Sequence, residues 1–191
     1  MAQRILVTGG AGFIGSFLVR ELVSQGFEVR ILDNLSTGSL SNLREVLDFV
    51  EFIEGDIRNE KIVEKSIKGV EAIVHLAALI NVAESIEKPD LYFDVNVRGT
   101  FNLAKASRSV SAFIFASSCA VYGDPVRMPI TEDHPLMMFN IVSASAYNIG
   151  SGISITINEL ARLILRIMNR EDLKPVHTTP SLETLDIHIQ V

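Results

Sequence analysis

A glycine-rich segment near the N-terminus has the residue types and the spacing to hold phosphate groups. The segment Thr8-Gly9-Gly10-Ala11-Gly12-Phe13-Ile14-Gly15 follows a short apolar run and precedes an amphipathic one. The glycines Gly9, Gly12 and Gly15 permit a tight turn, a close approach of backbone to a pyrophosphate, and close packing of a helix on a strand. The free N–H groups and the positive end of that helix would bind the phosphates. Glycine-rich turns are common, so this motif alone is a weak signal.

Asp33 gives a second indication, because it ends the next β-rich run of the chain. A carboxylate at that point accepts hydrogen bonds from the adenosine ribose hydroxyls of a dinucleotide. Its charge would repel a ribose 2′-phosphate, so the pattern favours NAD over NADP. The alternative is that Asp33 is a turn or cap residue. A strand, a glycine turn, a helix and an acid follow one another in the expected order, so dinucleotide binding is the better interpretation.

Apolar runs alternate with amphipathic stretches over the first 118 residues, and these elements must position the motif. The runs are continuous, as is typical of strands buried on both faces; they are Ile5–Val7, Val29–Leu32, Val50–Ile53, Ala72–Leu76 and Phe113–Phe115. The helical candidates are Phe13–Ser24, Asn59–Ile67 and Leu91–Ala106. This alternation predicts an α/β fold with a doubly wound parallel sheet of the Rossmann type and crossover helices.

The character of the chain changes after Ser118. Residues 119–140 contain three prolines and are predicted to form a loop. Thr156-Ile157-Asn158-Glu159 has the pattern of a capping box, which predicts a helix through Met168. We therefore expect a sheet domain over residues 1–138 and a separate segment over residues 139–191.

Composition restricts the function classes. With 191 residues the chain is long enough for one compact domain or for one domain plus a fragment. Its net charge of −6 argues against an electrostatic grip on nucleic acid or on an anionic membrane. No apolar run approaches the length of a membrane span, and no signal peptide precedes the first strand. Cys119 is the only cysteine, which fits a reducing cytoplasm. We predict a cytoplasmic location, and we predict no metal site.

Six segments in order resemble the extended short-chain dehydrogenase/reductase family, specifically its NAD-dependent sugar-nucleotide epimerase/dehydratase members, and most closely the UDP-glucose 4-epimerase branch. They are Thr8–Gly15, Leu32-Asp33-Asn34-Leu35, Glu54–Asn59, His75-Leu76-Ala77-Ala78, Asn96-Val97-Arg98-Gly99-Thr100 and Ser117–Gly123. The resemblance covers residues 1 to about 135. It implies the strand order 3-2-1-4-5, a bound NAD, a nucleotide-sugar substrate, and epimerisation by transient hydride transfer to that NAD.

The resemblance also implies roles for residues that match the family's cofactor motifs. Phe13 and Ile14 would contact the pyrophosphate through their backbone. Asp33 and Asn34 would bind the adenosine ribose. Asp56 and Ile57 would flank the adenine. The cofactor channel would be lined by Leu76, Ala77 and Ala78.

Three more positions carry implied roles at the active-site end. Asn96 would fix its helix against the active-site strand, Ser117 belongs to the cofactor-binding set, and Ser118 corresponds to the catalytic serine. Each has a plain structural alternative. Asp56 could cap the helix Asn59–Ile67, the two serines could be ordinary strand-end hydroxyls, and Asn96 could be a buried polar group of a helix.

The family's chemistry requires a tyrosine and a lysine four residues apart on one helix, and this sequence lacks that pair. The tyrosinate takes or returns the sugar hydroxyl proton, while the lysine lowers its pKa and holds the ribose. The three tyrosines are each followed four residues later by another residue type: Tyr92 by Asn96, Tyr122 by Val126 and Tyr147 by Ser151. We therefore predict no turnover. The chain would then be a non-catalytic NAD-binding module or a decayed gene product.

Two lesions would explain this pattern. The first is an internal deletion, with its junction between about residue 138 and about residue 145. It would remove the catalytic helix and the next strand of the family, and would leave residues 139–191 as a remnant of the substrate domain. The family continues with Pro-Gly-Asp-Ile-Arg-His-Ser, which one shifted reading frame across Ser181–His188 can encode, so we infer a frameshift near Thr179–Ser181. The loss of a strand would leave an uncovered apolar edge. The family pairs two helices per subunit, and only Leu91–Ala106 is present for a homo-oligomer.

Overall fold

The computed structural model describes residues 3–123, 125–131 and 133–135. The chain divides into two compact units, Met1–Ser117 and Ser118–Val191. The boundary expected at residue 138 lies outside the described residues, as do the helix expected from Thr156, the inferred deletion and the inferred out-of-frame tail. These four points stay predictions.

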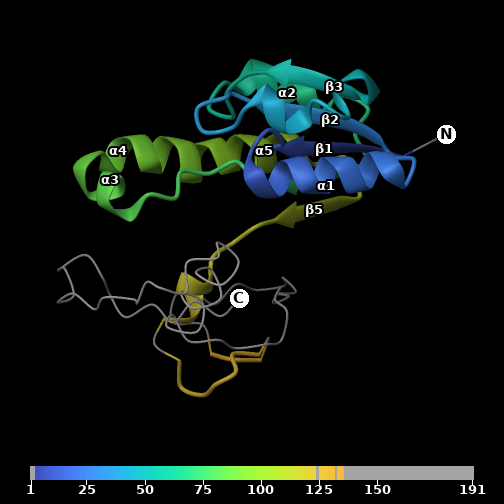
Figure 1. The fold of residues 1–191 in the computed structure, drawn as a ribbon. Helices are drawn as coiled ribbons and strands as arrows, with labels where there is room; N and C mark the ends of the chain where they lie inside the picture. The colour runs from blue at the N-terminus through green and yellow to red at the C-terminus, as the bar shows by residue number, and fades with distance from the viewer. Residues whose placement is uncertain (1–2, 124, 132, 136–191) are drawn as a thin grey trace, which may run out of the picture. The chain divides into compact units, whose positions relative to one another are not determined.

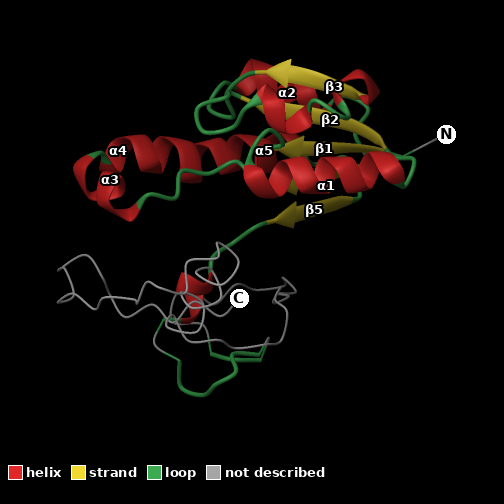
Figure 2. Ribbon diagram, in the orientation of Figure 1, coloured by secondary structure: helices red, strands yellow, loops and turns green. Residues whose placement is uncertain are grey.

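The first unit is built on a sheet of five parallel strands (Figure 2). The strands are β1 (Arg4–Thr8), β2 (Glu28–Asp33), β3 (Val50–Glu54), β4 (Ala72–His75) and β5 (Ala112–Phe115). Their order is β3-β2-β1-β4-β5, and each neighbouring pair runs parallel. In the centre of the sheet, Val7 of β1 lies between Ile31 of β2 and Val74 of β4. The predicted fold class and strand order are confirmed.

The helices follow the predicted crossovers with some additions. They are α1 (Phe13–Ser24), α2 (Glu60–Ile67), α3 (Val82–Glu87), α4 (Pro89–Tyr92), the π-helix η3 (Phe93–Gly99) and α5 (Thr100–Ala106), with 3-10 turns η1 (Leu40–Leu43) and η2 (Leu47–Phe49). The helix predicted over Leu91–Ala106 is therefore found as three consecutive segments with a π-helical centre. The turn-sized elements α3, η1 and η2 are too short to show a helical period, so the sequence did not predict them.

The start of α2 is capped by Asn59 rather than by Asp56. The side-chain oxygen of Asn59 accepts hydrogen bonds from the backbone N–H groups of Lys61 (3.1 Å) and Ile62 (3.3 Å). These are the donors that a helix start leaves without partners. The alternative interpretation of Asp56 as the cap of this helix is therefore wrong.

The sheet has an apolar core on each face. Alternation along β1 directs Ile5 and Val7 to the face covered by α1, and Leu6 to the face covered by α2 and α5. Figure 1 shows these helices on the two faces of the sheet. Leu6 and Val7 are both fully buried. Burial of β1 on both faces explains its unbroken apolar run.

Burial on both faces does not extend to the two edge strands. The residues of β3 are exposed or half-buried, and three of the four residues of β5 are exposed. Within the described ranges β3 pairs only with β2, and β5 only with β4. Ile114 and Phe115 are 57% and 52% exposed. The expectation of full burial is therefore wrong for β3 and β5, because each has a neighbouring strand on one side only within the described residues.

The second unit is described only over its first residues. A 3-10 turn η4 (Cys119–Tyr122) lies in the segment predicted to be loop. Next to it, His134 is buried, its Nε2 accepts from the backbone N–H of Val126 (3.0 Å), and its ring lies edge-on to Tyr122 at 5.6 Å. Helices long and apolar enough to cross a membrane do not occur among the residues that the structure describes.

The exposed edge strand predicts concentration-dependent association. Replacing Ile114 by threonine keeps a β-branched residue but removes exposed apolar surface from an edge. We expect Ile114→Thr to raise the protein concentration at which light scattering begins. The control is Ile86→Thr, because Ile86 is 73% exposed in α3, which belongs to neither edge strand. Equal effects of the two substitutions would contradict a special role of the edge.

Candidate functional site

The parallel sheet brings the predicted cofactor residues of the first unit to one edge. The glycine turn follows β1, Asp33 ends β2, Asp56 follows β3, and Leu76 follows β4. Because the strands are parallel, their carboxyl ends lie together. The order of the strands reverses between β1 and β4, since the connections from these two strands lead to opposite sides of the sheet. The crevice at such a switch point is where ligands bind in open α/β sheets.

The glycine turn is pressed against the loop that follows β4. Gly9 has a φ of +72°, which favours glycine, and its N–H donates to the carbonyl of Leu32 (3.0 Å). A Cβ on Gly9 would lie 2.8 Å from the backbone nitrogen of Ala77. A Cβ on Gly15 would overlap the carbonyl oxygen of Gly9. The first and third glycines are therefore required by contacts with backbone, which cannot move aside as a flexible side chain can.

The start of α1 is open to an anion. The N-cap is Gly12, which has no side chain to accept from the first turn, and no acidic residue occurs in that turn. The N–H groups of Phe13, Ile14 and Gly15 lie before the first intrahelical donor, that of Ser16, which bonds to the carbonyl of Gly12 (3.0 Å). Phe13 and Ile14 carry exposed side chains, so they contribute here through their backbone. This end of the helix fits a pyrophosphate in charge and in donors.

Asp33 connects the end of β2 to the glycine turn. It is buried; its Oδ2 accepts from the N–H of Ala11 (2.9 Å) and its Oδ1 from the N–H of Leu35 (2.8 Å). The second bond forms a tight turn in which Leu35 has a φ of 55°. Asp33 is thus a turn residue, as the alternative interpretation held, and each carboxylate oxygen keeps a lone pair for a ribose hydroxyl. Both interpretations of this acid are compatible.

The loops after β2 and β3 are joined by side chains. Exposed Asn34 donates from Nδ2 to Oδ2 of Asp56 (2.9 Å). The guanidinium of Arg58 contacts both oxygens of Asp56, and this hydrogen-bonded ion pair lowers the pKa of the Asp56 carboxyl to about 2. Ile57 is buried, and its carbonyl accepts from Nδ2 of Asn102 in α5 (3.1 Å). The residues expected around the adenine are therefore held in place from two sides.

The loop after β4 is held by Thr8, for which no role was predicted, and by Asn96, which was expected to fix its helix against the active-site strand. The N–H of Ala77 donates to Oγ1 of Thr8 (3.3 Å). The amide of Asn96 in η3 accepts from the N–H of Leu79 (2.9 Å) and donates to its carbonyl (2.8 Å). Asn96 thus fixes its helix against this loop, and Ala78 between the two anchors is exposed.

His75 and Thr100 also take part, although no role was predicted for either residue from the sequence. His75 is buried at the end of β4, with Nδ1 2.7 Å from Oγ1 of Thr8 and Nε2 2.9 Å from Oγ1 of Thr100. A histidine within an apolar strand was the available signal. Its partners lie 67 residues before it and 25 residues after it, so only the tertiary structure identifies them.

The two serines fall on either side of the division between units. Ser117 is exposed two residues beyond β5 in the first unit. Ser118 opens the second unit, where its carbonyl accepts from the N–H of Val121 (3.2 Å) at the start of η4. The cofactor role of Ser117 and the catalytic role of Ser118 stay predictions.

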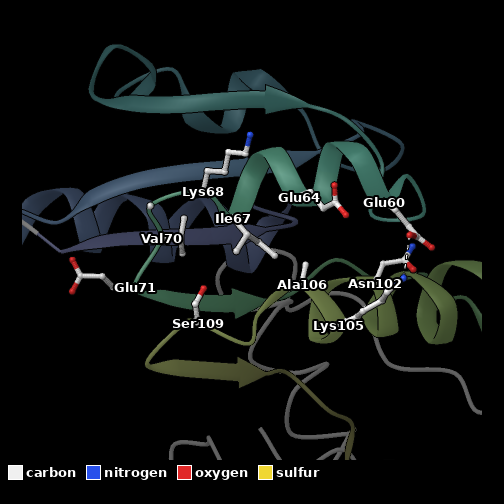
Figure 3. A pocket seen from close by; sticks show the side chains of 11 residues that line it. Glu60, Glu64, Ile67, Lys68, Val70, Glu71, Asn102, Lys105, Ala106 and Ser109 are labelled. Carbon is white, nitrogen blue, oxygen red and sulfur yellow. Dashed lines mark hydrogen bonds and ion pairs between the residues drawn. The ribbon is translucent and has the colours of Figure 1, made fainter.

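Cavity volume does not mark the site. A groove of about 630 Å³ lies between α2 and α5, with side chains of both helices along it (Figure 3). Lys105 Nζ lies 3.3 Å from Glu60 Oε2 at this groove, and none of the predicted cofactor residues lines it. A hollow of about 650 Å³ beside Asp56 and Arg58 does adjoin the predicted adenine end. Among the described residues, no cluster of His, Cys, Asp and Glu could hold a metal ion.

The glycine contacts predict unequal costs of adding a methyl group. We expect Gly15→Ala to lower the free energy of unfolding by about 2 kcal/mol or more, because the new Cβ meets the carbonyl oxygen of Gly9. Gly12→Ala is the matched control, because its Cβ would lie 3.2 Å from the same oxygen and needs only a small adjustment. Chemical denaturation measures both, and similar losses would show that the close packing at Gly15 is wrong.

Burial of His75 predicts a dependence of stability on pH. Burial lowers the pKa of this imidazole from 6.5 to about 4. Between pH 6.5 and pH 4, His75 is therefore protonated in the unfolded chain but neutral in the folded chain. The free energy of unfolding should therefore be highest above pH 6.5 and fall by up to about 3 kcal/mol as the pH drops towards 4. Denaturation curves at pH 7, 5.5 and 4.5 measure this slope.

The matched variant His75→Gln removes the titrating group and should flatten that slope. Asp56→Asn should leave it unchanged between pH 6.5 and 4.5, because the pKa of Asp56 falls from 3.8 to about 2 and its effect belongs to lower pH. A slope that persists in His75→Gln would assign the pH dependence to other groups.

Known proteins resemble this chain in sequence and in fold. Residues 5–150 match the NAD dependent epimerase/dehydratase family. UDP-glucose 4-epimerase from Lactobacillus helveticus is 43% identical over 143 residues, which are 72% of this chain and 42% of that protein. The crystal structure of UDP-glucose 4-epimerase from Brucella ovis in complex with NAD is 41% identical, with a TM-score of 0.65, over 71% of this chain and 42% of that one.

A third protein represents the dehydratase activity. The structure of dTDP-glucose 4,6-dehydratase from Streptomyces venezuelae, with NAD and TYD bound, is 37% identical with a TM-score of 0.65, over 70% of this chain and 45% of that one. The chain thus spans less than half the length of these relatives. Its family match nevertheless covers most of its own residues, and on this ground the chain belongs to the NAD-dependent epimerase/dehydratase family.

Proposed function

We propose that the first unit binds NAD across the carboxyl edge of its sheet. The observation that supports this most is the arrangement of the glycine turn: it leads into the uncapped start of α1, it contacts the loop after β4, and Asp33 clamps it through Ala11. Donors for a pyrophosphate and acceptors for a ribose are thus adjacent on a rigid sheet. The NAD-bound structures among the relatives support the same cofactor.

Each predicted residue receives one task in this proposal. Phe13 and Ile14 bind the pyrophosphate through their N–H groups, while Asp33 and Asn34 accept from and orient the adenosine ribose. The adenine lies against the loop after β3, where Asp56 and Ile57 contact it and the ion pair of Asp56 with Arg58 holds the loop in place. The remaining positions, which line the channel beyond the pyrophosphate, are Leu76, Ala77, Ala78 and Ser117. Bound NAD would supply a hydride acceptor; the protein binds it and orients it.

We further propose that this chain binds the cofactor without turning over a nucleotide sugar. Relatives named as UDP-glucose 4-epimerases, one of them solved with NAD+ and UDP, indicate the substrate class of the family. The proton-transferring tyrosine with a lysine four residues later does not occur in this sequence. Hydride transfer from the sugar to NAD also requires removal of the sugar hydroxyl proton, and without that tyrosine no residue is assigned to remove it. Ser118 alone would supply a hydrogen bond.

A homo-oligomer stays a prediction, with one supporting observation. Phe93, Val97 and Phe101, on the helix that the resemblance assigns to subunit pairing, are 54%, 51% and 63% exposed. Exposed apolar residues in a row mark a surface that associates. A cytoplasmic location also stays a prediction.

Calorimetric titration of the full chain with NAD and with NADP tests the cofactor proposal. We expect NAD to bind more tightly, because the Asp33 carboxylate repels a ribose 2′-phosphate. Asp33→Asn should weaken NAD binding about tenfold or more and reduce the difference between the two cofactors. The matched control Asp48→Asn changes an exposed acid in η2 and should leave both affinities as they are.

The outcomes separate the competing functions. A folded chain, shown by circular dichroism, that binds neither cofactor would contradict NAD binding and favour a decayed gene product. Binding together with measurable conversion of UDP-glucose to UDP-galactose by the pure chain would contradict the absence of turnover. Binding without conversion is the result we expect.

A further inference from the structure

The buried imidazole of His75 connects two elements that flank the loop after β4. Only 1% of the residue is exposed, and both ring nitrogens have hydroxyl partners: Thr8 at the end of β1 and Thr100 at the start of α5. Its other neighbours are the rings of Phe113 and Phe115 in β5, with centroids 6.2 Å and 5.5 Å away. The ring therefore lies between the strand that leads into the glycine turn and the helix that carries Asn96.

The partners of the two hydroxyl groups fix the direction of every hydrogen bond. The Thr100 hydroxyl donates to the carbonyl of Asn96 (2.7 Å), so its oxygen must accept from Nε2–H of His75. The ring is then unprotonated at Nδ1, which accepts from the Thr8 hydroxyl. The Thr8 oxygen in turn accepts the N–H of Ala77 (3.3 Å). Each hydroxyl uses its single proton once, and the imidazole carries its proton on Nε2.

This chain of hydrogen bonds begins and ends on the same loop. At one end is the N–H of Ala77; at the other is Asn96, whose side-chain amide pairs with both the N–H and the carbonyl of Leu79. The backbone of Ala77 also lies against Gly9, where a single Cβ would not fit. A shift of this loop would therefore move directly into the glycine turn.

The surroundings keep the ring in the neutral form that the chain of bonds requires. Burial, with no charged partner contributing, lowers the pKa of His75 to about 4. Asn96 lies within the π-helix η3, a rare geometry that is frequent at functional sites. A buried network in which each donor and acceptor is satisfied is rigid, and it holds one arrangement.

We propose that His75, in its Nε2–H tautomer, is a positioning residue that holds residues 76–79 in the shape that receives NAD, acting through Thr8 and Thr100. This proposal rests on the proposed cofactor function. His75 itself does not touch the cofactor in this arrangement; it sets the position of the backbone that does. The loop after β4 and the glycine turn thereby form one preorganised surface.

The tautomer and the loop are both measurable in the full chain without cofactor. In the ¹⁵N-labelled protein at pH 7, we expect His75 to show a protonated Nε2 and an unprotonated Nδ1. Thr100→Val keeps the shape of the side chain but removes the hydroxyl that joins His75 to Asn96. We expect the amides of Ala77 and Leu79 to exchange about tenfold faster in this variant, and NAD to bind about tenfold more weakly.

Two matched variants separate positioning from a general loss of stability. Thr100→Ser restores the hydroxyl and should restore both amide protection and NAD affinity. Ser66→Ala removes another fully buried hydroxyl, which donates to the carbonyl of Ile62 (2.8 Å) in α2, outside this chain of bonds. It should leave the two amides and the affinity unchanged.

Several results would overturn the proposal. A proton on Nδ1 of His75 would reverse the deduced direction. Unchanged exchange at Ala77 and Leu79 in Thr100→Val, or equal weakening of NAD binding in Ser66→Ala, would show that the bonds do not position the loop. If the unaltered chain binds no NAD, the proposed cofactor function fails; the tautomer and the exchange rates, measured on the free chain, still decide whether His75 holds the loop.

Discussion

The structure depends on one close approach of two backbone segments. The turn after β1 and the loop after β4 meet at Gly9 and Ala77, with no room for a side chain between them. These strands are neighbours in the centre of the sheet, and their connections lead to opposite sides of it, so the carboxyl edge opens at this point. The glycine turn, the start of α1 and the His75 hydrogen bonds are all arranged around that contact.

The charges at this edge are divided in a way that suits a dinucleotide. The acids stand at the ends of β2 and β3, where Asp33 is held by two backbone N–H groups and Asp56 by Arg58. The start of α1 has neither an acidic residue in its first turn nor a capping side chain. Because the polar groups are already fixed by the protein, little conformational freedom would be lost on binding. In the proposed NAD site, the adenosine would lie at the acidic end and the phosphates at the start of α1.

The similarity of this chain to its family covers the part with the glycine turn but does not extend to the tyrosine and lysine of the family's reaction. The relatives are matched over less than half of their length. The matched part includes the glycine turn and the loops after β2, β3 and β4, whereas a tyrosine followed four residues later by a lysine does not occur in this sequence. The exposed Ile114 and Phe115 on β5 show, within the described residues, an apolar edge of the kind that another strand or helix usually covers. Binding without turnover therefore stays a proposal.

The pattern of apolar residues predicted secondary structure correctly where the burial of a residue depends on the element that it belongs to. The central strands, α1 and the glycine turn were predictable because full burial gives unbroken apolar runs and a helix gives a regular stripe. The resemblance to known motifs added the strand order and a set of expected cofactor residues. The burial of the edge strands was wrongly expected, because an apolar run such as Phe113–Phe115 looks the same whether or not a further layer covers it.

The sequence by itself determined the class of fold, the position of the phosphate turn and the acid at Asp33, because each depends on residues close together in the chain. Only the tertiary structure decided the polar network. His75 bonds to Thr8 and Thr100, Asn96 bonds to Leu79, and Asn102 bonds to the carbonyl of Ile57. These partners are 17 to 67 residues apart in the chain. A hydrogen bond requires atoms about 3 Å apart, and only the folded sheet brings such distant residues within that distance.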